Sequence, residues 1–172
     1  SERYYMKVAL NKWLTVLICC LLSMPVWSQV ATTEDSSATT DKAHNEWLKQ
    51  RFSKQHQALI PIVAVADIFF SCNKARKVEP KSYQLNELIT QMDKNVLAEK
   101  LANCLGEDTM QSDTALNFGL FGCFHQQLAH LPKAEREQKM TLVKQAVSSL
   151  SHDERKKSFT QCVTEQSIHY LK

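Results

Sequence analysis

Glycine is scarce in this chain: only three occur among 172 residues, at Gly106, Gly119 and Gly122. A fold rich in β-strands needs many tight turns with positive φ, and glycine supplies most of them. The scarcity of glycine therefore argues against a β-rich fold. Leucine, alanine, lysine, glutamine and glutamate are abundant instead, and these residues favour helix. The composition predicts an all-α domain, a compact bundle of about six helices.

A large excess of one charge sign is also missing. The formal net charge of the whole chain is +3, and it falls to +1 for Gln29–Lys172, where 18 basic residues face 17 acidic ones. A nucleic-acid-binding protein needs a concentrated basic face. The densest basic run, Arg155-Lys156-Lys157, directly follows Asp153-Glu154, which is typical of a solvated helix face. We therefore expect no nucleic-acid partner.

The sequence patterns of the common catalytic and metal sites do not occur. The chain has no G-x-S-x-G elbow, no H-E-x-x-H zinc helix and no phosphate-binding loop. It also has no C-x-x-C pair, the spacing that is usual in thiol redox centres and in zinc sites. We expect neither a metal nor a cofactor, and a role other than catalysis.

The N-terminal residues predict a cleavable export signal at Met6–Ser28. Two lysines precede an apolar stretch at Trp13–Leu22, and Val26 and Ser28 suit the −3 and −1 positions of signal peptidase cleavage. The apolar stretch is much shorter than the roughly 20 residues that span a bilayer. Residues 1–5 precede the start methionine and are treated as upstream residues. We therefore expect a periplasmic or secreted protein without a membrane span after cleavage.

Composition divides the rest of the chain into a leader and a domain. Residues 29–43 are rich in Thr, Ser, Ala and Asp, which predicts a disordered leader. Residues 44–172 are predicted to form a single helical domain, and its most apolar stretch is Ala58–Phe70. This stretch is too short for a membrane span, and we predict a buried core helix that starts near Pro61. A strand is the less favoured alternative, because good helix formers follow the stretch.

Residues typical of helix ends indicate where the remaining helices begin and end. Serine and aspartate side chains can accept hydrogen bonds from the first free N–H groups of a helix, and Ser151 with Glu154 has the spacing of a capping box. Gly106 can adopt the left-handed conformation that ends a helix. The expected starts are at Ser82, Asp93, Ser112 and Ser151, with Pro132 in the first turn of one further helix.

Four cysteines remain after the predicted cleavage, at Cys72, Cys104, Cys123 and Cys162. An even number in an exported chain predicts two disulfides, for which three connectivities exist. The pattern Phe69-Phe70-Ser71-Cys72 is similar to Leu120-Phe121-Gly122-Cys123, which suggests two pseudo-repeated three-helix units. This duplication favours Cys72–Cys104 and Cys123–Cys162, one disulfide within each unit.

The segment from Leu116 to Leu128 is apolar almost all round. Such a helix is either central or leaves part of its surface for a partner, and we favour the central position. The candidate binding surface is Phe118, Phe121 and His125. The small residues Ala115, Gly119 and Gly122 share a strip, which favours close helix packing over a ligand groove.

Asp67 is the candidate buried charge, because it lies within the most apolar stretch. Burial of a carboxyl raises its pKa and can make it an acid or a base. Buried charges are usually paired. We therefore favour a position at the helix edge or beside a basic side chain.

We expect the partner to be another protein, with this chain as an inhibitor, immunity protein or adaptor. In size, export and cysteine count the chain is similar to the small exported helical immunity proteins of interbacterial secretion systems, and no motif residue extends that similarity. The alternative is a carrier of a small apolar ligand or lipid in a cavity lined by Ala58–Phe70 and Leu116–Phe124. An enzyme that uses Asp67 and a histidine is the least favoured hypothesis. A homodimer is compatible with the sequence.

Overall fold

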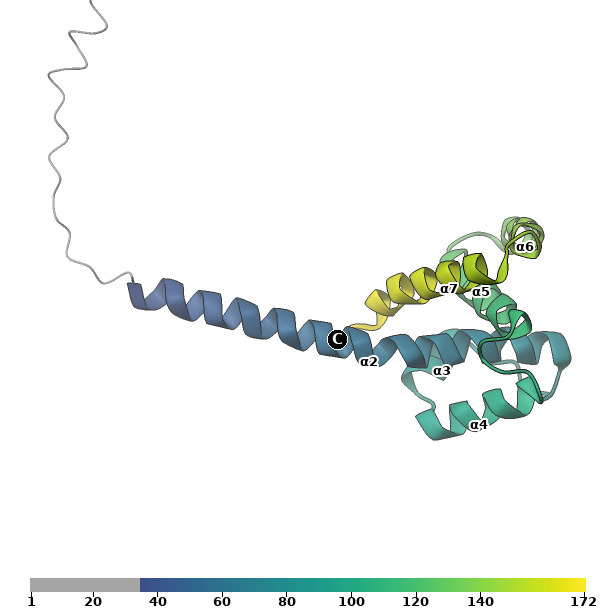
Figure 1. The fold of residues 1–172 in the computed structure, drawn as a ribbon, viewed down its shortest axis with the longest axis horizontal. Coiled ribbons are helices and arrows are strands. Elements are labelled where there is room, and N and C mark those ends of the chain that lie inside the picture. Colours follow the sequence, from purple (N-terminus) through teal and green to yellow (C-terminus); the bar gives the residue numbers. More distant parts are fainter. Residues whose placement is uncertain (1–34) are drawn as a thin grey trace, which may run out of the picture. The chain divides into compact units, whose positions relative to one another are not determined.

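The computed structural model describes residues 35–172, and the chain divides into two units, 1–42 and 43–172. The predicted upstream residues 1–5, the predicted export signal at 6–28 and residues 29–34 lie outside the described residues. The described part is helical throughout, with turns between the helices and no strand (Figure 1). The prediction of an all-α bundle of about six helices is therefore confirmed. The helices are α2 (Asp35–Arg76), α3 (Leu85–Thr90), α4 (Lys94–Leu105), α5 (Asp113–Gln127), α6 (Lys133–Ser148), α7 (His152–Ser167) and the 3₁₀ helix η1 (Ile168–Tyr170).

Helix α2 is much longer than predicted. Its first residues, 35–43, belong to the segment whose composition predicts a disordered leader. No glycine or proline occurs between Asp35 and Ile60, so a helix that nucleates in the core can extend backwards at little cost. Pro61 lies inside α2 and not in a first turn. An interior proline costs about 3 kcal/mol, and burial of the apolar residues that follow it offsets this cost.

The apolar part of α2 forms the centre of the core. Val63, Ile68 and Phe69 are fully buried in one cluster with residues of the other helices. By length and composition Thr39–Arg76 could also cross a membrane, and 44% of its most apolar window is buried within the protein. The complete burial of these three side chains favours a core helix.

The first three helices form a triplet closed by a disulfide between Cys72 of α2 and Cys104 of α4. Helix α3 has six residues, of which Leu85, Leu88 and Ile89 are buried. It starts without a side-chain cap, so the predicted cap at Ser82 is wrong.

Helix α4 begins and ends where the sequence predicts, but Gly106, with a ψ of −117°, does not adopt the predicted left-handed helical conformation. The Asp93 carboxylate accepts hydrogen bonds from the backbone N–H groups of Asn95 and Val96, and Gly106 ends the helix with a φ of 63°. The Arg76 guanidinium of α2 donates to the carbonyls of Cys104 and Leu105 at 2.8 and 2.9 Å. These bonds satisfy carbonyl groups that the end of α4 leaves without a helical partner.

Helices α5, α6 and α7 form a second triplet, closed by a disulfide between Cys123 of α5 and Cys162 of α7. The predicted caps Ser112 and Ser151 are both present, and Ser151 forms the capping box with Glu154. Pro132 is the N-cap residue of α6, one position before the predicted first turn.

Both predicted disulfide pairings are therefore confirmed. Each bond joins the first and third helices of its triplet. Disulfides form and persist in oxidising compartments, so the two bonds indicate an oxidising, exported location. The finer assignment to the periplasm or the outside of the cell remains a proposal.

Helix α5 packs tightly against its neighbours through its two glycines. A Cβ on Gly122 would lie 2.4 Å from the backbone oxygen of Asp67 in α2, and a Cβ on Gly119 would lie 2.4 Å from the ring of Phe159 in α7. Ala115 is also fully buried. The strip of small residues thus serves close helix packing, as the sequence favours.

Candidate functional site

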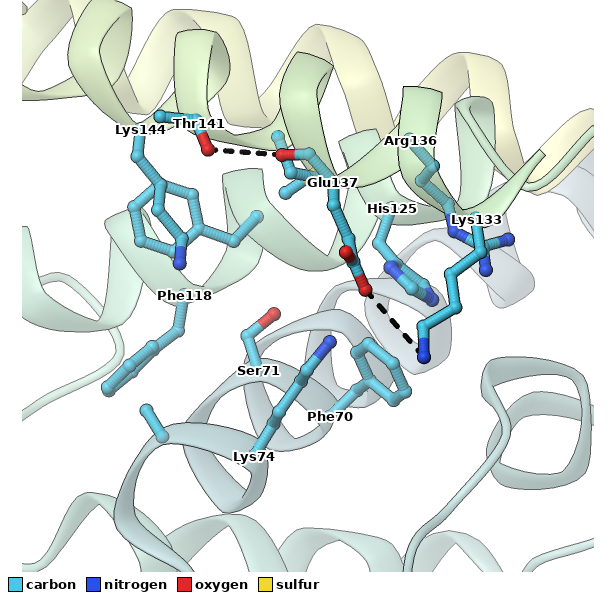
Figure 2. Close-up of a pocket in the computed structure, with 13 residues that line it drawn as sticks. Phe70, Ser71, Lys74, Phe118, His125, Lys133, Arg136, Glu137, Thr141 and Lys144 are labelled. Atoms are coloured by element: carbon cyan, nitrogen blue, oxygen red, sulfur yellow. Dashed lines mark hydrogen bonds and ion pairs between the residues drawn. The ribbon is translucent and has the colours of Figure 1, made fainter. Parts of the chain in front are cut away.

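An open cleft of about 580 Å³ lies between α2, α5 and α6. Figure 2 shows side chains of α2 and α6 that face the same space from opposite sides. Three half-buried phenylalanines give the cleft its apolar surface, and all three also pack against the core: Phe70, Phe118 and Phe121. Ser71, Ala75, Met140 and Thr141 complete the uncharged lining.

Basic side chains surround this apolar surface. Lys74 extends from α2, while Lys133, Arg136 and Lys144 line the cleft from α6 (Figure 2). The one carboxylate in the lining belongs to Glu137, whose Oε1 lies 4.0 Å from the Lys133 Nζ. The lining therefore carries four permanent positive charges and one negative charge.

His125 lies where the apolar and basic parts of the cleft meet. Its ring centroid is 4.9 Å from that of Phe70, and the side chain is about half-buried. Burial lowers the pKa of His125, and the nearby charges of Lys74 and Arg136 lower it further. The imidazole is therefore neutral at neutral pH and adds no charge to the cleft.

A second hollow of about 730 Å³ adjoins the first. The two share four lining residues: Phe70, Lys74, His125 and Arg136. The second hollow continues past the end of α2 to the turn before α3, where Lys77, Lys81 and Glu79 are among its lining residues. We call these two adjoining hollows together the α2–α5–α6 groove.

The structure brings the three predicted surface residues together. Phe118, Phe121 and His125 all line the first hollow. Sequence reasoning placed no residue of α6 in the candidate binding surface. A signal was present: Lys133, Arg136, Glu137, Met140, Thr141 and Lys144 recur at i, i+3, i+4, i+7, i+8 and i+11, which places them on one helix face.

Asp67 lies apart from the groove, in the core. Its side chain is fully buried, and its Oδ1 accepts a hydrogen bond of 3.1 Å from the Gln166 amide of α7. Its Oδ2 has no hydrogen-bond partner. Burial raises the pKa of Asp67 well above its usual value, and the bond from Gln166 offsets this only in part.

The burial expected for Asp67 is therefore present, but the expected position at a helix edge or beside a cation is wrong. Among the described residues no basic side chain forms an ion pair with it, and its hydrogen-bond partner is an amide. The backbone of Asp67 lies directly against Gly122 of α5, so this residue is in the interior and not at an edge of α2.

The four cysteines are all committed to disulfides. Within residues 35–172 no three His, Cys, Asp or Glu side chains gather where they could hold a metal ion. The chain matches no protein-family profile, no curated protein and no solved structure. The α2–α5–α6 groove is therefore the basis for assigning a function.

Proposed function

We propose that this chain is an exported, disulfide-stabilised helical module that binds another protein, as an inhibitor, immunity protein or adaptor. The observation that carries the proposal is the open first hollow, with three phenylalanines in its wall and basic side chains around them. Aromatic residues, methionine and arginine are enriched in protein interfaces, and such exposed apolar surface usually marks an interaction site. The export signal predicted at Met6–Ser28 and the two disulfides support a location in the periplasm or outside the cell.

The scaffold suits this role because the groove has three helical walls. Helices α2 and α5 are fixed to each other by the contact at Gly122, and each carries one end of a disulfide. A preorganised surface binds a partner without a large entropic cost of ordering.

A retention experiment tests the proposal. The full chain is exported by its own predicted signal and carries a C-terminal tag. It is purified in the oxidised form from a periplasmic extract. We expect a specific protein to copurify, and we expect the double variant Phe118→Ala with Phe121→Ala to lose it. Leu142→Ala is the matched control, because Leu142 lies on α6 with 59% of its surface exposed and does not line the groove. Equal retention by all three chains, or retention by none, would contradict the proposal.

A carrier of a small apolar ligand is the second candidate function. The first hollow lies within the range of small-ligand sites, roughly 300–1,000 Å³, and Phe70, Phe118 and Phe121 come from the two segments expected to line such a cavity. The hollow opens to solvent, whereas the buried core is filled by side chains. Native mass spectrometry of the purified protein distinguishes the two functions, because a carrier would retain a lipid at stoichiometric amount.

A further inference from the structure

We infer that the α2–α5–α6 groove binds an acidic segment of the partner protein, which places an aromatic or long aliphatic side chain between the phenylalanines. This inference rests on the proposed function and adds the chemistry of the partner. It is carried by the charges of the groove, by its apolar lining and by the combined volume of its two hollows.

The charges of the groove lack internal compensation. Within residues 35–172 no carboxylate lies within 4.0 Å of Lys74, Lys77 or Lys144. Other charged side chains near the groove do form ion pairs. Glu79 is held by Lys100 at 2.7 Å, and Lys81 is held by Glu87 at 2.6 Å. Of these free cations Lys74 lines both hollows, Lys144 lines only the first and Lys77 lines only the second. Since the predicted mature chain has a net charge of only +1, this local excess is a property of the groove.

The apolar surface lines the same hollow as Lys74 and Lys144. Phe70 approaches from α2, and Phe118 and Phe121 approach from α5, one helical turn apart. One face of Phe118 is near the guanidinium of Arg76, 5.5 Å from the ring centroid, so its other surface is available to the groove. A side chain that enters here gains apolar contact while carboxylates beside it can reach Lys74 or Lys144. An amphipathic acidic segment satisfies both requirements.

The combined volume of the two hollows favours a polypeptide over a single small molecule. The two adjoining hollows together exceed the roughly 1,000 Å³ that is the upper end for small-ligand sites. Lys77 and Lys144 lie in different hollows, and Lys74 and Arg136 line both. A partner with several carboxylates spaced along a chain can contact all of them, whereas a fatty acid has one.

His125 supplies an independent readout. Its pKa is lowered by burial and by the charges of Lys74 and Arg136. A bound carboxylate would compensate those charges, and the pKa of His125 should then rise. A neutral apolar ligand would bury the ring further and should lower it.

Photo-crosslinking tests the inference on the whole protein. The full chain, oxidised and exported, carries p-benzoylphenylalanine in place of Phe121 or of Thr141, an exposed residue of the opposite wall. The crosslinked segment of the copurifying protein is then sequenced by mass spectrometry. We expect more Asp and Glu than Lys and Arg in that segment, with an aromatic or aliphatic residue at the crosslink.

A peptide with the crosslinked sequence then serves as the probe in fluorescence anisotropy. The double variant Arg136→Glu with Lys144→Glu should weaken its binding at least about tenfold. The control, Lys156→Glu with Lys157→Glu, changes the net charge equally on the exposed face of α7 and should weaken binding less than twofold. Added salt should weaken the wild type more than the groove variant.

The possible failures are distinguishable. A neutral or basic crosslinked segment, a crosslink to lipid, or equal effects of the two charge reversals would overturn the inference and leave the proposed function standing. A partner retained without any crosslink from position 121 or 141 would do the same. If no protein copurifies with the wild-type chain, the proposed function itself fails.

Discussion

The two disulfide-linked triplets have the same covalent scheme and use their middle helices differently. In the first triplet α3 is six residues long, and Leu85, Leu88 and Ile89 are buried. In the second triplet α6 is sixteen residues long, and only Val147 is buried. The first middle helix belongs to the core, whereas the second presents a long polar face beside α2 and α5. The groove exists because of this difference.

The difference shows how one scaffold separates stability from binding. The disulfide fixes the first and third helices of each triplet, so the middle helix is the element that can change in length without disturbing the core. The sequence separation of the paired cysteines is 32 in one triplet and 39 in the other. The extra residues add a wall to the groove and little to the core.

Removal of the disulfides should have the largest effect. Cys72→Ala with Cys104→Ala, and Cys123→Ala with Cys162→Ala, should each lower the free energy of unfolding by about 3–4 kcal/mol in the chain-entropy model. Because the two loops are similar in length, the two losses should agree within about 0.5 kcal/mol. Urea unfolding of the oxidised wild type and of both variants measures this. A much larger loss in the second triplet would show that its covalent link compensates for a middle helix outside the core.

Substitutions of the two glycines of α5 test two packing contacts. Gly122 packs against the first triplet, and Gly119 packs within the second. Gly122→Ala drives a methyl group into the α2 backbone and should lower the free energy of unfolding by about 2–3 kcal/mol. Gly119→Ala meets the end of the Phe159 ring, which can move, and the better helix propensity of alanine offsets part of the cost. A loss of about 1 kcal/mol is expected there.

Thermal and urea unfolding of both glycine variants measure the ranking. Gly106→Ala is the control for backbone strain, because Gly106 has a φ of 63° and an added methyl group would meet no other atom within 4 Å. It should cost about 1–3 kcal/mol, because the Gly106 backbone, with φ 63° and ψ −117°, lies in a region that residues with a Cβ rarely adopt. If Gly119→Ala proved costlier than Gly122→Ala, α7 and not α2 would be the rigid neighbour of α5.

Asp67 of the first triplet contacts Gln166 of the second, and its ionisation should weaken their packing. Burial raises the pKa of Asp67 in the folded state, so the protein loses stability as pH rises from about 4, the usual pKa of an unfolded aspartate, through the folded pKa. Asp67→Asn cannot ionise and should stabilise the protein by about 1–3 kcal/mol at pH 7.

The pH dependence distinguishes ionisation from a simple change in packing. The difference between wild type and Asp67→Asn should be smallest near pH 4 and should grow toward neutral pH, as measured by urea unfolding at several pH values. Glu99→Gln is the control, since Glu99 is exposed on α4 and should change the pH profile little. A constant difference from pH 4 to pH 7 would mean that the charge of Asp67 has no part in the effect.

Local and covalent features of the fold were predictable from the sequence. Asp93, Ser112 and Ser151 cap helices because their side chains bond backbone groups two or three residues away, so the signal lies within one turn. The disulfide pairing followed from the similar surroundings of Cys72 and Cys123. The true length of α2 was not predictable from composition, because Thr and Ser are weak helix formers and the helix is extended from its buried part.

The groove was predictable only on one side. Phe118, Phe121 and His125 attract attention because aromatic residues on an already apolar helix exceed what one buried face can hold. The stripe of Lys133, Arg136 and Lys144 looks like an ordinary solvated face, and only the tertiary structure places it opposite Phe70. The role of this polar helix face depends on the residue that it packs opposite, which lies 60 or more residues away in sequence.

The smallest expected effect is a change in the pKa of His125, a residue near positive charges of both triplets. Lys74 of α2 and Arg136 of α6 both lower the pKa of His125 in α5. Lys74→Gln should therefore raise the pKa of His125 toward its ordinary value, as should Arg136→Gln, and NMR titration of the imidazole measures both changes. Lys157→Gln, on an exposed position of α7, should leave it unchanged. If only the α6 variant moved the pKa, the charge of the groove would belong to the second triplet alone, and the first would contribute only Phe70 and the apolar wall.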